Sequence, residues 1–185
     1  VFALVSSAAM GQKVKNKDFK TKLKLAKKEA KTLEKDDWYV SPGDLPLAKQ
    51  LEKNYQKQLE EDENGYPKYI IASGNAVAQT QSAAKMQAQE IAKLEIANQL
   101  SSQIAATIDN QIANNQLNQE DAANLQKMVA AAKNVISNKI GRTLDLVEMY
   151  RTLKNKNVEC QVRVGYSMDL ARQAAVSSMK EQLQA

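Results

Sequence analysis

Five lysines in the first part of this sequence have the spacing of a binding site for negative charge. Their intervals of seven, four, three and four residues would place them on one face of a helix. Ammonium groups gathered in this way attract lipid headgroups, lipopolysaccharide or nucleic acid. The alternative is the solvated face of a helix whose other side packs on the domain. These candidate anion-binding residues are Lys17, Lys24, Lys28, Lys31 and Lys35.

The positive charge of the chain is concentrated around these lysines. The 185 residues include 26 basic and 21 acidic residues, which gives a net charge of +5. Residues 13–35 alone hold ten lysines against Asp18, Glu29 and Glu34, so this segment carries +7 and the rest of the chain −2. Any function of the positive charge therefore belongs to one N-terminal element.

Residues for other kinds of chemistry are scarce. The chain has no histidine and a single cysteine, Cys160, which removes the usual members of catalytic and metal-binding sets and any internal disulfide. Ser73 has no glycine two residues before it, so it does not fit the nucleophile elbow of serine hydrolases. We therefore expect a protein that is not an enzyme, with no catalytic, cofactor-binding or metal-binding residues and no cofactor.

An acidic stretch at residues 60–65 imitates the start of a calcium-binding loop. Oxygen-bearing side chains stand at Glu60, Asp62 and Asn64. The twelfth position of such a loop must supply a bidentate carboxylate, but here it is Ile71. We interpret the stretch as a solvated acidic turn that ends with Asn-Gly.

Residues 1–11 have the pattern of the end of a secretory signal peptide. They are apolar and then small, with Ala9 and Gly11 at the positions that precede a cleavage site before Gln12. The alternative is a buried N-terminal strand or helix turn. No later segment has the roughly 18 apolar residues of a membrane span. We therefore expect an exported protein, which argues against nucleic acid as a partner.

The lysines would be positioned by a helix over residues 17–35. Its apolar residues recur at alternating spacings of four and three. Pro42 and Gly43 fit the centre of a type II turn, after which Asp44 would cap a second helix. Residues 12–64 would thus form a two-helix N-terminal extension. The predicted buried faces are Phe19, Leu23, Ala26, Ala30 and Leu33 in the first helix and Leu47, Leu51, Tyr55 and Leu59 in the second.

The stretch over residues 68–116 would be the backbone of the fold. Residues 68–78 predict a strand covered on both faces, and Gly74 with its small neighbours favours close approach by a helix. A long helix would follow, with an alanine-rich half on the sheet and an isoleucine-rich half projecting beyond it. Its apolar stripe is Ala84, Ala88, Ala92, Ile96, Leu100, Ile104, Ile108 and Ile112, widened in the first half by Ala83, Ile91, Leu94 and Ala97.

The rest of the chain predicts a helix, two strands and a last helix. Asn118 would cap the first of these, which would run to Gly141 and pair with the long helix as an antiparallel hairpin. Strands at 143–153 and 158–167 would form a β-hairpin in which Cys160 points into the core. The apolar stripes are Leu125, Val129, Ala132, Ile136 and Ile140 in the paired helix and Ala171, Ala175, Met179 and Leu183 in the last one.

Together these elements predict an α+β domain at residues 65–185, after the signal remnant and the helical extension. Its small, three-stranded, mainly antiparallel sheet would be covered by the long helical hairpin and the C-terminal helix. The helices would cover mainly one face of this sheet. The opposite, solvent-facing side of the β-hairpin would carry Glu159, Gln161 and Arg163.

The order of motifs in residues 68–185 resembles the LPP-twenty-type envelope lipoproteins. The shared features are a short strand ending in SGNAVA, the alanine-spaced helix AAKMQAQEIAKLEIANQL, the terminal strand VECQVRVGYSMDLA and a short final helix. The module is also similar to the N-terminal module of a flagellar assembly accessory protein. The resemblance implies an envelope-associated, non-enzymatic module and supplies no catalytic residues. The chain departs from the family at Gln12, where a lipid-anchored member has cysteine, and in its two-helix extension.

These patterns lead to two hypotheses of function. In the first, the chain is an exported, non-enzymatic, envelope-associated protein that acts through contacts with other envelope proteins. In the second, its basic helix binds an anionic lipid or polysaccharide surface, such as a membrane. Both hypotheses place it in the periplasm or at the outer membrane of a Gram-negative bacterium, without nucleic acid as a partner.

Overall fold

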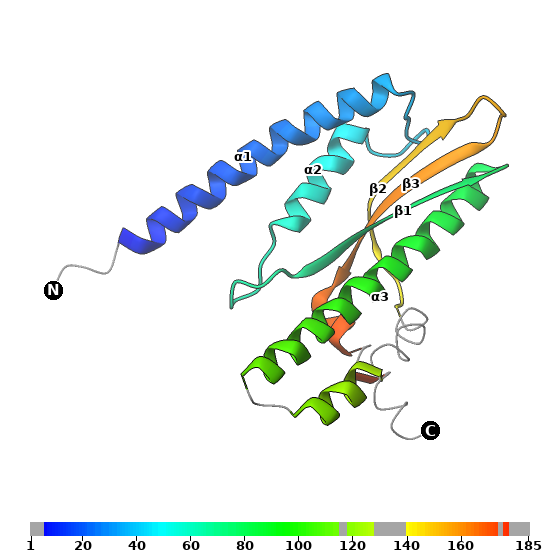
Figure 1. Cartoon of the computed structure of the whole chain (residues 1–185). Helices are drawn as coiled ribbons and strands as arrows, with labels where there is room; N and C mark the ends of the chain where they lie inside the picture. Colours follow the sequence, from blue (N-terminus) through cyan, green and yellow to red (C-terminus); the bar gives the residue numbers. More distant parts are fainter. Residues whose placement is uncertain (1–5, 115–117, 128–139, 174–175, 178–185) are drawn as a thin grey trace.

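The computed structural model describes residues 6–114, 118–127, 140–173 and 176–177, with the side chains of 6–18 and 107–112 left out. Figure 1 shows the sheet as a middle layer, with the long helix of residues 81–113 on one side and the helices of residues 6–35 and 47–58 on the other. The fold class is α+β, as the sequence predicts. The elements are α1 (Ser6–Lys35), α2 (Leu47–Gln58), β1 (Tyr69–Ala78), α3 (Gln81–Ala113), β2 (Leu144–Thr152) and β3 (Val158–Ser167).

The sheet has the strand order β1-β3-β2, and both neighbouring pairs are antiparallel. β2 and β3 form the predicted β-hairpin. β1 pairs with β3 along its whole length, from Tyr69 opposite Ser167 to Ala78 opposite Val158. The alternation of apolar and polar residues in β3 therefore fixes which side chains face each layer of helices.

The alanine-rich half of α3 packs directly on β1. Ala84, Ala88 and Ala92 are fully buried, and their small side chains let the helix lie close to the strand. A Cβ atom on Gly74 would overlap the carbonyl oxygen of Ala88, so the predicted close approach is confirmed. This first core also contains Ile70, Ala72, Ile96, Ala97, Leu100, Ile140, Tyr150, Cys160, Val162, Val164, Tyr166 and Ala171.

A second core lies on the opposite face of the sheet, where α2 packs on β2 and α1 packs on α2. The expectation that helices cover mainly one face is therefore wrong. β2 is apolar on both sides: Val147 and Met149 face α2, whereas Tyr150 belongs to the core under α3. The second core consists of Ala26, Ala30, Trp38, Leu47, Leu51, Val147 and Met149.

The side chains expected to face solvent on β3 are partly buried: Glu159, Gln161 and Arg163. Glu159 accepts a hydrogen bond from Asn75 of β1 at 2.9 Å and forms an ion pair with Arg151 of β2 at 2.6 Å. Burial alone would raise the pKa of the Glu159 carboxyl, but these two partners lower it below its ordinary value. The prediction that this side of the β-hairpin faces solvent is wrong, because its polar groups pair with Asn75, Arg151 and Glu29.

The N-terminal helices differ from the predicted ones at their ends. α1 begins at Ser6, well before residue 17. The turn before α2 has the expected form, since Gly43 has a φ of 93° and the Asp44 N–H donates to the Ser41 carbonyl oxygen. The N-cap of α2 is Pro46, and no side chain caps this end. The predicted cap by Asp44 is wrong because this residue precedes the N-cap by two positions.

The predicted buried faces extend too far at the N-terminal end of α1 and at the C-terminal end of α2. Phe19 and Leu59 are both 37% exposed. Figure 1 shows that the N-terminal half of α1 extends past α2, and Leu59 is the C-cap of α2. In the middle of α2, the amides of Gln50 and Asn54 are buried beside Leu47 and Leu51, which the apolar pattern does not predict.

The stripe of α3 is buried from Ala84 to Leu100, as predicted, and Ile104 is partly buried. Ala97 widens it, but Ile91 and Leu94 are 45% and 42% exposed, so their predicted role is wrong. Residues four apart drift about 40° per step around a helix, which turns this flank toward solvent. The side chains of Ile108 and Ile112 lie outside the described residues.

A second helix returns beside α3, as the predicted helical hairpin requires (Figure 1). The Asp121 N–H donates to the Asn118 side-chain oxygen at 2.8 Å, which confirms the predicted cap. Leu125 is partly buried, and Ile140 and Ala171 are buried. The other predicted stripe residues lie outside the described residues: Val129, Ala132, Ile136, Ala175, Met179 and Leu183.

Candidate anion-binding surface

Four of the five predicted anion-binding lysines are exposed on α1. The opposite side of this helix buries Ala26 and Ala30 against its neighbours. At about 1.5 Å per residue, the row of four is about 16 Å long. Lys17 also belongs to α1, but its side chain lies outside the described residues. The four exposed residues are Lys24, Lys28, Lys31 and Lys35.

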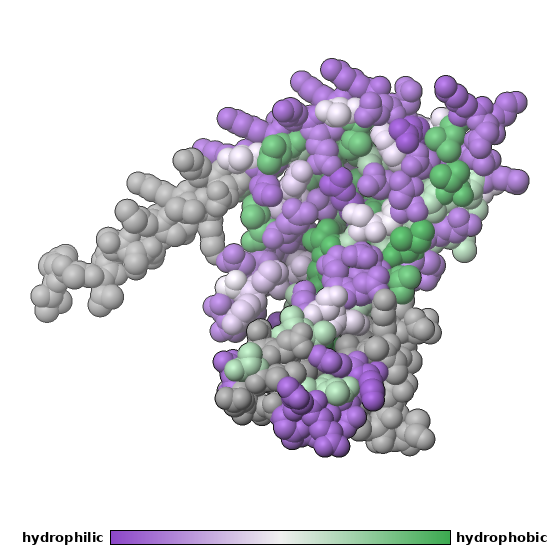
Figure 2. All heavy atoms as spheres, viewed as in Figure 1, coloured by the Kyte–Doolittle hydropathy of each residue, from purple (hydrophilic) through white to green (hydrophobic). Residues whose placement is uncertain are grey.

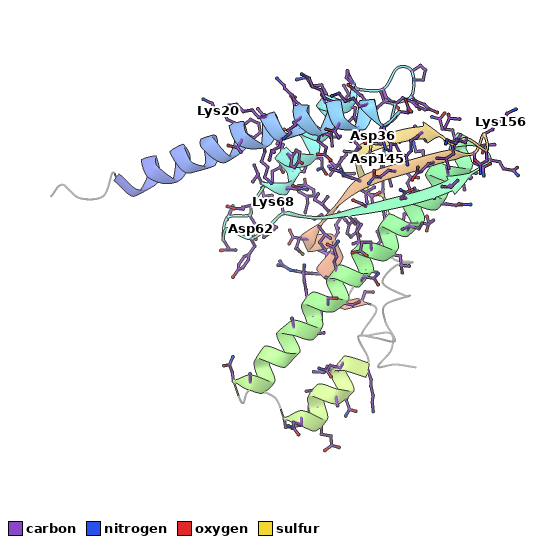
Figure 3. The ribbon with its side chains drawn as sticks, turned by 45° about the horizontal axis from the view of Figure 1, so that its top comes forward. Lys20, Asp36, Asp62, Lys68, Asp145 and Lys156 are labelled. Atoms are coloured by element: carbon purple, nitrogen blue, oxygen red, sulfur yellow. The ribbon has the colours of Figure 1, made fainter. Side chains whose placement is uncertain are left out.

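Two further exposed lysines, Lys20 and Lys27, flank this row and were not predicted. At about 100° per residue, both lie on the edge of the same helical face. These two lysines could have been predicted from the sequence, because a helical projection places them beside the other four. Figure 3 labels Lys20 on α1. We use the term basic face for Lys20, Lys24, Lys27, Lys28, Lys31 and Lys35.

Among the described residues, no carboxylate forms an ion pair with a lysine of the basic face. Other lysines are paired, such as Lys49 with Glu52 and Lys57 with Glu60, both at 2.7 Å. Figure 2 shows hydrophilic residues across the side of the molecule where α1 and α2 lie. The charge of the basic face is thus available to an external anion.

The orientation of α1 is fixed by contacts on its other sides. The Glu29 carboxylate accepts hydrogen bonds from Arg163 of β3 and from the Tyr55 hydroxyl of α2, the latter at 2.7 Å. Burial and this bond to Glu29 raise the pKa of Tyr55. The Lys22 ammonium lies 5.1 Å from the centre of the Tyr55 ring. These contacts hold the helix so that the basic face points away from the sheet.

Cys160 is placed for packing rather than for nucleophilic chemistry. It is fully buried in the first core, and burial raises the pKa of its thiol to about 11. At neutral pH the group is therefore a thiol, whereas the thiolate is the nucleophile. Its neighbour Tyr150 donates a hydrogen bond to Glu148, and burial raises the pKa of this phenol as well.

The acidic turn at residues 60–65 is held by hydrogen bonds to Asp62. The Asp62 carboxylate accepts hydrogen bonds from the N–H groups of Asn64 and Tyr66, both at 2.9 Å. Within the described ranges, no group of three or more cysteine, aspartate or glutamate side chains is arranged to hold a metal ion. None of the described helices combines the length and the apolar character needed to cross a membrane.

Comparisons with protein-family models, with curated proteins and with solved structures gave no match for this chain. The resemblance to the LPP-twenty-type lipoproteins therefore stays a prediction. The basic face is the feature of the described residues that most directly supports a proposal of function.

Proposed function

We propose that this chain is an exported, envelope-associated protein without enzymatic activity that binds an anionic lipid or polysaccharide surface through α1. The observation that carries the proposal is the basic face: six exposed lysines on one side of one helix, with no ion pair to a described carboxylate. Such a row attracts a surface of closely spaced negative charges more strongly than it attracts a single small anion.

The packing of α1 supports this role. Buried alanines on one side and the contacts of Glu29 with Arg163 and Tyr55 hold the helix against the domain. The lysines do not take part in these contacts, so we expect their replacement to leave the packing of α1 unchanged. A preformed, rigid row also loses less conformational entropy on binding than a flexible basic tail does.

The test is cosedimentation of the whole protein with vesicles that contain an anionic phospholipid, and with lipopolysaccharide aggregates. Near an anionic surface each lysine contributes about 1 kcal/mol, so replacing four by glutamine should weaken binding by up to about a thousandfold. Binding of the unchanged protein should also fall as salt is raised, because salt screens exposed charges. The variant replaces Lys24, Lys28, Lys31 and Lys35.

A matched control removes the same number of charges from other parts of the surface. Four exposed lysines outside α1 are replaced by glutamine, and binding should stay close to that of the unchanged protein: Lys68, Lys127, Lys154 and Lys156. Figure 3 labels Lys68 and Lys156 on segments other than α1. Equal losses in the two variants, or binding to DNA that exceeds binding to vesicles, would contradict the proposal.

Contacts with other envelope proteins are the second candidate function. The observation that favours it is a pair of exposed apolar side chains on α3: Ile91 and Leu94. Ile91 and Leu94 are three residues apart and therefore neighbours on the helix. Cross-linking of the protein in fractionated envelopes tests this second function. Replacing Ile91 and Leu94 by serine should remove a specific cross-linked protein, whereas binding to vesicles should be unchanged.

A further inference from the structure

A polar pocket of about 290 Å³ lies along the outer edge of β2, and no lysine of the basic face lines it. Its walls come from the segment before α2, from α2, from the first turns of α3 and from β2. At this place β2 carries a β-bulge between Asp145 and Val147. Bulges turn side chains away from the regular alternation and are common beside binding sites. Figure 3 labels Asp145 on this strand.

Two hydrogen-bond networks hold the walls of the pocket in place. The Gln50 side chain, 7% exposed, donates to the Leu45 carbonyl oxygen at 2.9 Å and accepts from the Glu148 N–H at 2.7 Å. The Lys85 ammonium forms an ion pair with Glu148 at 2.7 Å, and Tyr150 donates to the same carboxylate. Three separate elements are thus connected around one preformed hollow.

Three charged groups of the lining, Lys53, Asp44 and Asp145, form no direct ion pair with a described residue. Lys53 donates to the Asp145 backbone oxygen at 3.0 Å, but no described carboxylate forms an ion pair with it. Asp44 and Asp145 are exposed, and their carboxylates form no ion pair with a described cation. The pKa of Lys85 is raised mainly by its hydrogen bond with Glu148. The negative charges of Asp145 and Asp44 raise it further.

We propose that this pocket binds a free amino acid, a small molecule that carries an ammonium group and a carboxylate close together. Lys53 would donate to the carboxylate of the ligand, and Asp44 and Asp145 would accept from its ammonium group. The volume lies at the lower end of the range for small-molecule sites, which fits a ligand of this size.

Simpler ligands would balance these charges less well. An anion bound to Lys53 alone would lie beside the carboxylates of Asp44 and Asp145. A cation between those carboxylates would leave Lys53 without a negative partner. A zwitterion satisfies both sides, and charge-assisted hydrogen bonds of this kind are the strong ones in proteins.

The test is a titration of the whole protein with single L-amino acids, followed by calorimetry and by backbone NMR shifts. N-acetyl amino acids lack the ammonium group and amino-acid amides lack the carboxylate, so both should bind at least about tenfold more weakly than the free amino acid. Lys53→Gln and Asp44→Asn should each weaken binding of the free amino acid by a similar factor.

Lys49→Gln is the matched control, because Lys49 lies one turn before Lys53 on α2 but is paired with Glu52 and does not line the pocket. This variant should bind as the unchanged protein does. The variant of the basic face should also retain the amino acid, since the pocket is independent of the proposed surface binding. The proposal is overturned if no amino acid binds at millimolar concentration, if both blocked analogues bind as well as the free form, or if calcium alone shifts the same amides.

Discussion

At the scale of single residues, Gly74 determines how closely α3 can approach the sheet. A Cβ atom at this position would meet backbone atoms of α3, including the Ala92 nitrogen at 2.8 Å. Backbone cannot yield as a flexible side chain can, so Gly74→Ala should lower the free energy of unfolding by about 1–3 kcal/mol. Urea unfolding followed by circular dichroism measures this change.

Gly141→Ala is the control for this prediction. An added Cβ there meets no atom within 4 Å, so the substitution should change stability by less than about 0.5 kcal/mol. Equal stability of the two variants would show that α3 does not lie on β1 as closely as described.

Two buried amides on α2 should respond in opposite directions to the same substitution. Both polar atoms of Asn54 are buried without a hydrogen-bond partner among the described residues, whereas Gln50 bonds to Leu45 and Glu148. Asn54→Leu should therefore raise the free energy of unfolding by about 1–2 kcal/mol, and Gln50→Leu should lower it by about 1–3 kcal/mol. Chemical denaturation of both variants checks the signs, and a destabilised Asn54→Leu would contradict the burial of an unpaired amide.

These residues also show what the sequence can and cannot predict at this scale. The exposed lysines of α1 follow from helical periodicity alone, because the period of an α-helix is fixed. The burial of Gln50 and Asn54 cannot be predicted in this way, since amides are mostly exposed and only a tertiary neighbour decides otherwise. The amino-acid pocket is likewise formed by residues from segments distant in the chain, so no local sequence pattern predicts it.

At the scale of elements, Glu29 connects α1 to both α2 and β3. Its carboxylate accepts hydrogen bonds from both Tyr55 and Arg163. The side chains of Glu29 and Arg163, which form the ion pair, are largely shielded from water. Glu29→Gln should loosen α1, because Arg163 then lacks a counter-charge. We expect the hydrogen-exchange protection of α1 amides to fall about tenfold, with little change in α3.

Glu34→Gln provides the comparison on the same helix. Glu34 is exposed and has no ion pair with a described residue, so its replacement should leave the protection of α1 unchanged. If both variants lose protection equally, the effect comes from the changed charge of the helix and not from the contact with Arg163.

The elements themselves were largely predictable, because strong periodicity and turn residues define them locally. The β-hairpin and the stripe of α3 are examples. The position of α1 and α2 was not predictable in the same way. Val147 and Met149 give β2 a second apolar face, but the irregular pattern of this strand, caused by the β-bulge, hides that face in the sequence.

At the scale of the whole molecule, the second core joins the two-helix extension to the sheet. Leu47 and Leu51 of α2 share buried contacts with Val147 and Met149 of β2, across the domain boundary predicted near residue 64. That boundary and the one at residue 11 stay predictions. A shared apolar core nevertheless implies that the helices stabilise the sheet, and the sheet the helices.

The single tryptophan permits a direct test of this coupling. Trp38 lies in the second core, 7% exposed, with Arg151 of β2 above its ring at 4.8 Å. In urea, its fluorescence and the far-ultraviolet circular dichroism of the whole chain should change at the same midpoint, as in a single cooperative transition. Leu51→Ala, at a fully buried position, should lower the free energy of unfolding by about 2–5 kcal/mol. Both midpoints should then move together to a lower urea concentration. If the fluorescence midpoint moves alone, α1 and α2 unfold separately and the predicted boundary near residue 64 separates two units.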